Sequence, residues 1–117
     1  YLAVEGPAEA ACAAVAAFAA ETGLDLSAPL AAFRRRLALL AERGVAAERL
    51  SFSAAFGRRL DYYTGFMFEL FEPARGEGQI VGGGRYDRLL ALLGAPVPVP
   101  AVGFSIWLDR FGIGGAA

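Results

Sequence analysis

The residues best suited to chemistry fall into three short segments, residues 58–69, 82–87 and 101–110. The first holds two arginines and a pair of tyrosines, the second joins three glycines to an arginine and a tyrosine, and the third holds a tryptophan and an arginine. Aromatic rings offer stacking area, a phenol can exchange hydrogen bonds, and a guanidinium is a permanent forked donor. Glycines leave room beside the backbone. Together these residue types favour the binding of a small polar ligand.

Each segment taken alone also has an ordinary structural explanation. Three consecutive glycines are usually a turn, and this run lacks the Lys-Ser/Thr of a phosphate-binding loop. A Tyr-Tyr pair in a strand is usually core, and an arginine near a helix end is usually a surface charge. The specific signal is therefore the order and spacing of the three segments together.

The first of these segments lies in an aromatic stretch, residues 60–72, that predicts one long strand. Alternation gives this strand a face typical of core, formed by Tyr62, Thr64, Phe66, Phe68 and Leu70. The opposite face carries Tyr63, Gly65, Met67, Glu69 and Phe71. Because this second face is indented and partly polar, it suits a sheet that packs on helices and holds a ligand on its open side.

The remaining elements of this half follow from turn residues and prolines. The connection over residues 73–78 is too short for a crossover, so the next strand should be antiparallel. The prolines that alternate with valines over residues 96–100 exclude a helix there. The expected elements are a strand beginning at 79–81, a glycine run at 82–84 leading into a helix at 86–93, and a final helix near 103–111.

The first half of the chain predicts two helices and a short strand. A helix over residues 8–22 begins after Gly6-Pro7 and ends at Gly23, and a second helix begins with Ser27 as its N-cap and ends at Gly44. The second helix has an apolar stripe formed by Leu30, Phe33, Leu37 and Leu40. A strand should follow over residues 50–55. We therefore expect two parts, a helical segment at 1–50 and a sheet-bearing segment at 51–117.

Composition excludes several classes of function. The chain has 117 residues and a net charge of −1, so no overall field attracts it to nucleic acid or a membrane, and the Arg34-Arg35-Arg36 run is best explained as a solvated helix face. Cys12 is alone, which rules out an internal disulfide. No signal peptide, membrane span or metal-ligand cluster stands out, so we expect a cytoplasmic protein without a cofactor. The chain begins at Tyr1 rather than Met, so we expect a piece of a longer protein.

The three ordered segments resemble the histidine-binding motifs and motif 3 of the histidyl-tRNA synthetase family, over about residues 51–111. The resemblance implies an α+β fold, an antiparallel sheet flanked by helices, of which this chain is the C-terminal part of a class II aminoacyl-tRNA synthetase-like core. The family's motifs 1 and 2 lie upstream and have no counterpart in this sequence.

The resemblance also implies roles for individual residues. Arg58 matches an arginine that contacts the carboxylate of the amino acid, Tyr63 and Tyr86 match tyrosines that flank the imidazole of histidine, and Arg110 matches the motif 3 arginine that grips ATP phosphate. The implied histidine-binding set is Arg58, Tyr62, Tyr63, Gly65, Gly83, Gly84 and Tyr86. No catalytic residue and no metal ligand is implied.

The sequence departs from the synthetase pattern at three positions. Trp107 stands where the synthetase pattern has a glycine beneath the adenine, Asp109 stands where it has Glu, and Arg59 stands where it has a glycine. An indole in place of a glycine would fill the space that the base needs. Trp107 and Arg110 are therefore predicted to form a degenerate nucleotide site, although an ordinary core position for Trp107 stays open.

An intact histidine pocket beside a filled nucleotide pocket is more useful to a sensor than to a ligase. The sequence therefore favours a regulatory subunit of the kind that the synthetase-like relatives supply to ATP phosphoribosyltransferase. That resemblance implies a hetero-oligomer with the catalytic subunit, L-histidine as effector, a homodimer of the subunit itself, and no membrane or nucleic-acid partner. The alternatives are a histidine–tRNA ligase, and a generic α+β ligand-binding module with coincidental motifs.

Overall fold

The computed structural model describes residues 3–57, 62–75 and 78–111. The chain divides into two compact units, Tyr1–Phe56 and Gly57–Ala117. Arg58 lies outside the described residues. None of the helices within the described ranges has the length and apolar character needed to cross a bilayer.

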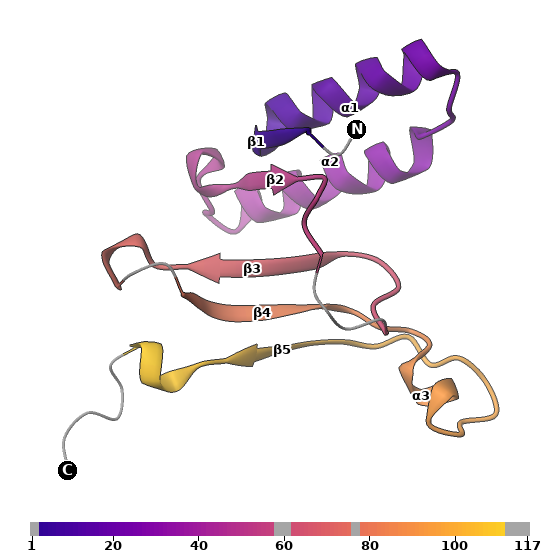
Figure 1. The fold of residues 1–117 in the computed structure, drawn as a ribbon, viewed down its shortest axis with the longest axis vertical. Helices are drawn as coiled ribbons and strands as arrows, with labels where there is room; N and C mark the ends of the chain where they lie inside the picture. The colour runs from indigo at the N-terminus through magenta and orange to yellow at the C-terminus, as the bar shows by residue number, and fades with distance from the viewer. Residues whose placement is uncertain (1–2, 58–61, 76–77, 112–117) are drawn as a thin grey trace. The chain divides into compact units, whose positions relative to one another are not determined.

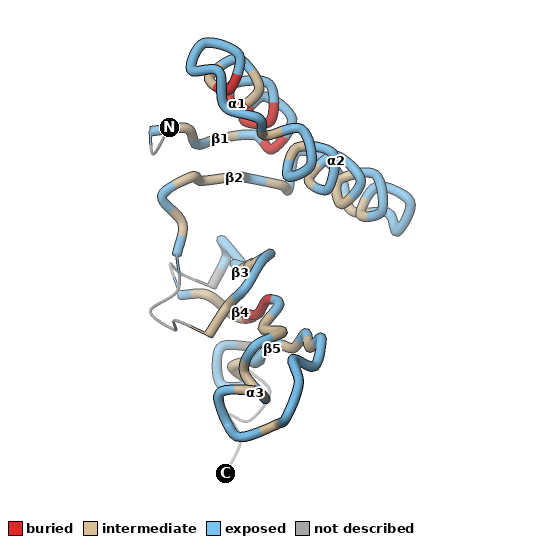
Figure 2. Tube along the Cα trace, turned by 90° about the vertical axis from the view of Figure 1, so that its right-hand side faces the viewer, coloured by how far each residue is buried: buried red, intermediate tan, exposed pale blue. Residues whose placement is uncertain are grey.

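The first unit begins with strand β1 (Glu5–Pro7), which is not among the elements predicted from the sequence (Figure 1). It runs directly into helix α1 (Ala8–Thr22), which begins where the Gly-Pro pair predicts. Gly23 ends α1 in the left-handed conformation, with φ of 68°, and its N–H donates to the carbonyl of Ala19. One stripe of α1 is buried and appears in red in Figure 2: Ala8, Ala11, Cys12, Val15 and Ala19. The helix is alanine-rich on all sides, so its sequence pattern does not indicate which side is buried, and packing against its neighbours decides it.

Helix α2 (Ser27–Glu42) begins one residue earlier than predicted, because Ser27 is its first residue and not its N-cap. Ser27 is the first helical residue, and the carboxylate of Asp25 accepts a 2.9 Å hydrogen bond from its N–H. Hydrogen bonds from the Ser27 side chain and backbone lower the pKa of Asp25. A carboxylate therefore replaces the predicted hydroxyl as the acceptor at this helix start.

The predicted apolar stripe of α2 lies on its half-buried side. Phe33 in this stripe contacts Phe52 of strand β2 (Ser51–Ser53), with ring centroids 5.3 Å apart. Of the three adjacent arginines, Arg34 and Arg35 are exposed, whereas Arg36 is half-buried and desolvation lowers its pKa. Strand β2 pairs antiparallel with β1, so the chain's first short sheet belongs to the helical unit.

The second unit is built on a three-stranded antiparallel sheet in the order β3-β4-β5. Its strands are β3 (Met67–Phe71), β4 (Gln79–Arg85) and β5 (Val102–Ile106), as Figure 1 shows. Together with the helices, this sheet confirms the predicted α+β class. The antiparallel partner strand beginning at Gln79 is also confirmed.

The long strand predicted over residues 60–72 is wrong for residues 62–66, and residues 60 and 61 lie outside the described part of the chain. The strand begins only at Met67, and residues 62–66 form an irregular segment. This segment still follows β4, because Thr64 N–H donates to the carbonyl of Arg85 and Arg85 N–H donates to the carbonyl of Phe66.

The prediction that the glycine run at 82–84 leads into a helix at 86–93 is also corrected, because the run does not lead directly into a helix. Gly82, Gly83 and Gly84 all lie within the central strand β4 and are buried. The following helix is α3 (Leu89–Leu92), shorter than expected, and the N–H groups of Tyr86 and Asp87 before it donate to neighbouring segments. Strand β4 keeps the glycines because side chains and backbone crowd it from both sides.

The final helix predicted near 103–111 is also wrong. Its first half is strand β5, and only Leu108–Phe111 forms a short 3₁₀ turn. The alternating sequence Val-Gly-Phe-Ser-Ile has the period of a strand, and β4 offers a free edge for pairing. The proline segment before it has no helix, as predicted.

Candidate functional site

Three tyrosines from two separate segments gather in the second unit. The rings of Tyr63 and Tyr86 lie 6.3 Å apart between centroids, at 65° to each other. Tyr62 completes a triangle with them, in contact with both, at 4.7 Å from Tyr63 and 5.6 Å from Tyr86. All three are half-buried, so the cluster combines a packed edge with an accessible one. The structure thus brings together the three predicted tyrosines, including Tyr62, which strict alternation had assigned to the opposite face.

Glycines of the sheet accommodate the rings. A Cβ atom at Gly84 would lie 2.8 Å from Cε1 of Tyr63 and 2.6 Å from the carbonyl oxygen of Phe66. A Cβ atom at Gly103 would overlap the hydroxyl of Tyr86. These glycines are opposite one another in the β4–β5 ladder, so they lie on the same sheet face. The two rings therefore pack on a floor that only glycine permits.

The other predicted glycines have different surroundings. A Cβ atom at Gly83 would meet the Cβ of Phe104 at 2.6 Å, and these two residues are paired in the ladder on the opposite face of the sheet. A Cβ atom at Gly65 would lie in ordinary contact, 3.5 Å from Cδ of Arg85. The space at both Gly83 and Gly84 is thus taken by the protein's own atoms. Gly84 lies under the Tyr63 ring, whereas Gly83 faces Phe104 on the other side of the sheet.

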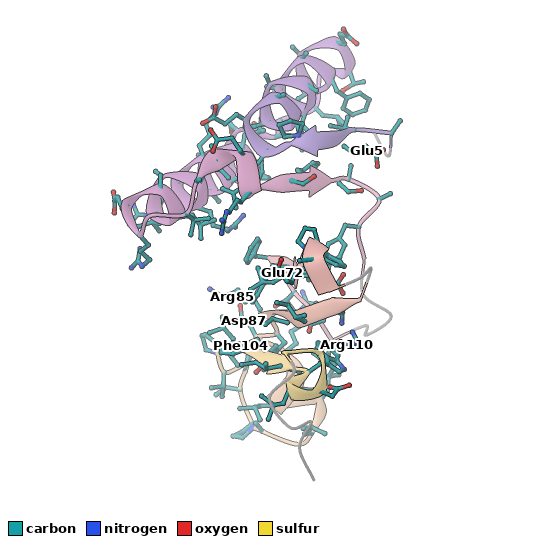
Figure 3. The ribbon with its side chains drawn as sticks, turned by 90° about the vertical axis from the view of Figure 1, so that its left-hand side faces the viewer. Glu5, Glu72, Arg85, Asp87, Phe104 and Arg110 are labelled. Carbon is teal, nitrogen blue, oxygen red and sulfur yellow. The ribbon has the colours of Figure 1, made fainter. Side chains whose placement is uncertain are left out.

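Asp87 links the segments that carry the tyrosines. Its Oδ1 accepts a 3.0 Å hydrogen bond from the N–H of Ala101, and its Oδ2 accepts a 2.7 Å hydrogen bond from Nε of Arg85. The N–H of Asp87 donates to Oγ1 of Thr64 at 3.0 Å. Figure 3 shows Arg85 and Asp87 side by side. The bond from Arg85 is the main reason that the pKa of Asp87 is lowered.

The backbone around Tyr86 is held on both sides. Its N–H donates to the carbonyl of Ala101, while the neighbouring Arg85 pairs with the segment that carries Tyr63. Sequence reasoning placed Thr64 on the core face of a strand and assigned no role to Asp87 or Gly103. Their place in the sequence could have indicated such a role, since Thr64 directly follows Tyr63 and Asp87 directly follows Tyr86.

Trp107 and Arg110 are in contact with each other at the end of β5. The guanidinium carbon of Arg110 lies 5.2 Å from the centroid of the half-buried indole, within the range of a cation–π interaction. Nη1 of Arg110 also donates to the carbonyl of Gln79, and the guanidinium lies against Gly78. Protein groups therefore already occupy both the face of the guanidinium and one of its donors.

An open groove of about 410 Å³ lies elsewhere, within the first unit. It runs between α1 and α2 and is lined mainly by alanine and other apolar side chains, with Glu9, Cys12 and Arg34 among them. Its lining includes none of the predicted site residues. In the described part of the chain, no group of three or more His, Cys, Asp or Glu is placed to hold a metal ion.

The antiparallel sheet, the glycine floor and the tyrosine cluster together define a synthetase-like α+β domain. The family of histidyl-tRNA synthetases matches residues 2–111. This chain belongs to that family, and the match extends well before the region on which the sequence resemblance was based.

Curated relatives of this chain carry the name of a regulatory subunit. It is 52% identical over 110 residues to the ATP phosphoribosyltransferase regulatory subunit of Agrobacterium fabrum, a match that covers 94% of this chain and 29% of the relative. It is 50% identical over 110 residues to the protein of the same name from Mesorhizobium japonicum, with the same coverage. The predicted resemblance to this regulatory subunit is confirmed. The chain spans less than a third of the length of these relatives.

A solved structure is also similar. It is described as a histidine–tRNA ligase subunit from Alicyclobacillus acidocaldarius, with a TM-score of 0.60 and 42% identity. The match covers 69% of this chain and 23% of that one. This likeness agrees with the α+β class II synthetase-like fold expected from the motifs.

Proposed function

We propose that this chain is part of a histidine-sensing regulatory subunit of ATP phosphoribosyltransferase. The whole protein would be non-catalytic, needed for the first step of histidine biosynthesis, and responsible for feedback regulation by histidine. The names of the curated relatives support the regulatory role. The single observation that supports histidine sensing is the Tyr63–Tyr86 pair, whose rings are 6.3 Å apart on one face of the sheet.

The geometry suits an imidazole ligand in physical terms. Two rings at a steep angle offer one face for stacking and one edge for contact, and phenol groups can donate to or accept from a ring nitrogen. Arg58 is proposed as the partner of the ligand's carboxylate, because a guanidinium binds a carboxylate through paired donors. Together with Tyr62, Gly65, Gly83, Gly84 and the tyrosine pair, it forms the proposed histidine-binding set.

The contacts of Arg110 support the second half of the proposal, a degenerate nucleotide site. A guanidinium stacked on an indole and bonded to a backbone carbonyl would have to give up these contacts to grip a phosphate. Trp107 adds bulk where the synthetase pattern has a glycine. A subunit with these properties binds an amino acid and forms no adenylate.

The proposed partners follow from the same role. The subunit assembles with the catalytic subunit of ATP phosphoribosyltransferase in the cytoplasm, forms a homodimer, and takes L-histidine as its effector. Feedback requires that histidine bind one state of this assembly more tightly than another, since a ligand shifts an equilibrium only by its difference in affinity. No cofactor, membrane or nucleic acid enters this proposal.

Calorimetric titration of the full-length protein with L-histidine tests the sensing role. We expect saturable binding, and about tenfold or greater weakening in both Tyr63→Ala and Tyr86→Ala, because each substitution removes a stacking ring. Glu21→Gln, on the exposed end of α1, is the control and should bind normally. An absence of heat together with an absence of competition at millimolar histidine would refute the sensing role.

A histidine–tRNA ligase is the second candidate, favoured by the name of the similar solved structure. Histidine-dependent exchange of pyrophosphate into ATP by the full-length protein separates the two. A regulatory subunit gives no exchange, whereas a ligase gives exchange that is lost in Arg110→Ala. Measurable exchange would replace the first proposal by the second.

A further inference from the structure

We propose that Asp87 is the positioning residue of the tyrosine cluster, and that its carboxylate sets how tightly the cluster binds its amino-acid ligand. The proposal rests on the histidine-binding role above for the identity of the ligand. Its physical basis is the arrangement of hydrogen bonds around this one side chain.

The carboxylate of Asp87 holds two different partners. Oδ1 accepts from the N–H of Ala101, which precedes β5, and Oδ2 accepts from the guanidinium of Arg85 at the end of β4. Hydrogen bonds to a charged acceptor are stronger than neutral ones. The side chains of Asp87 and Arg85 are 28% and 49% exposed, so water competes with their ion pair, whereas the bond from Ala101 N–H to Asp87 is partly buried.

The backbone of Asp87 holds a third segment. Its N–H donates to the hydroxyl of Thr64, the residue that follows Tyr63. The segments of Thr64, Asp87 and Ala101 are therefore joined at a single residue.

Each of these segments also carries part of the ring packing. Tyr63 and Tyr86 directly precede Thr64 and Asp87, and Gly103, beneath the hydroxyl of Tyr86, lies two residues after Ala101. A change in the Asp87 bonds would thus move the two rings and the floor beneath one of them relative to each other. A small error in the placement of supporting groups is enough to weaken a site built on them.

Asp87→Asn in the full-length protein tests this role. The amide keeps an oxygen for Ala101 N–H, but it removes the charge and turns a donor toward Arg85. We expect an affinity for L-histidine about tenfold lower than that of the wild type. Thr64→Val, which removes the acceptor of the Asp87 N–H, should weaken binding in the same direction, and Thr64→Ser, which keeps the hydroxyl, should restore it. Glu21→Gln controls for the loss of one negative charge.

Two readouts separate positioning from general support of the fold. Binding is measured well below the unfolding midpoint of each variant, and the Tyr63 and Tyr86 ring signals are followed by NMR in protein with labelled tyrosine. Positioning predicts shifted ring signals and weaker binding in folded Asp87→Asn and Thr64→Val. Should Asp87→Asn not fold, Thr64→Val and Thr64→Ser decide the question.

The possible failures are distinguishable. Wild-type affinity and unchanged ring signals in Thr64→Val and Asp87→Asn would overturn the positioning role while leaving histidine sensing intact. A wild-type protein that binds no histidine would overturn the proposed function, and the ring signals alone would then decide whether Asp87 positions the tyrosines.

Discussion

At the residue scale, the site depends on two glycines whose lack of a side chain leaves space for tyrosine rings. Gly84 and Gly103 lie directly beneath the rings of Tyr63 and Tyr86, and a single methyl group at either position would collide with them. These two glycines allow the rings, which are inclined at 65° to each other, to pack against one face of the sheet, and this packing fixes where the phenols can act.

Gly84→Ala should therefore disturb both stability and binding. The new methyl would lie 2.6 Å from a backbone carbonyl and 2.8 Å from the Tyr63 ring, so either the ring or the strand must shift. We expect a loss of about 1–3 kcal/mol in the free energy of unfolding, measured by urea denaturation. Histidine binding should weaken as well.

Gly57→Ala is the matched control, since a Cβ at that position has no neighbour within 4 Å. It should leave both quantities close to the wild type. Equal behaviour of the two alanine variants would show that Tyr63 does not occupy the space above Gly84 in solution.

At this scale, the sequence predicts which tyrosines gather more successfully than it predicts the contacts that hold them in place. The tyrosines were found because their types and order matched a known motif. Asp87 and Gly103 were overlooked because their importance arises from contacts across segments, between residues as far apart as Thr64 and Ala101. A one-dimensional pattern carries no information on such bonds.

At the element scale, local signals predicted the first unit well and the second only in part. Helix α1 has the predicted bounds, because a proline at its start and a glycine at its end act over one or two residues. The glycine run and the segment at 103–111 were assigned wrongly, since pairing with neighbouring strands decided their structure. Strand pairing is a long-range effect that outweighs local propensity.

The end of α1 offers a test of such a local signal. Gly23 has a φ of 68°, a conformation that costs an L-residue with a Cβ about 1 kcal/mol. Gly23→Ala should lower the free energy of unfolding by roughly that amount in urea denaturation, and Gly23→Asn should lose less, because asparagine tolerates the left-handed region better. Equal losses in the two variants would contradict this explanation.

At the scale of the whole molecule, one face of the second unit's sheet is unusually apolar and accessible. Alternation places Leu70, Phe104 and Ile106 on the face opposite the tyrosines, and they are 50%, 65% and 47% exposed. Apolar patches of this kind usually mark contact surfaces. The chain spans less than a third of its relatives, so this face is available to a second copy when the 117-residue chain is made alone.

We expect the isolated 117-residue chain to self-associate through this face. Size-exclusion chromatography with light scattering should give a mass above 12.3 kDa, and Phe104→Glu should return it toward that value. Leu24→Glu, at a residue that is 54% exposed in the first unit, is the control and should not change the mass. A wild-type chain that elutes as a monomer would argue against the contact.

The two ends of strand β5 belong to two different proposed sites, and this has an evolutionary consequence. Near its start Gly103 supports a phenol, while just past its end Trp107 and Arg110 hold each other. Under the proposed function, a lineage that stops handling nucleotides can let the far end drift. The near end stays under selection for as long as the protein must detect its amino acid.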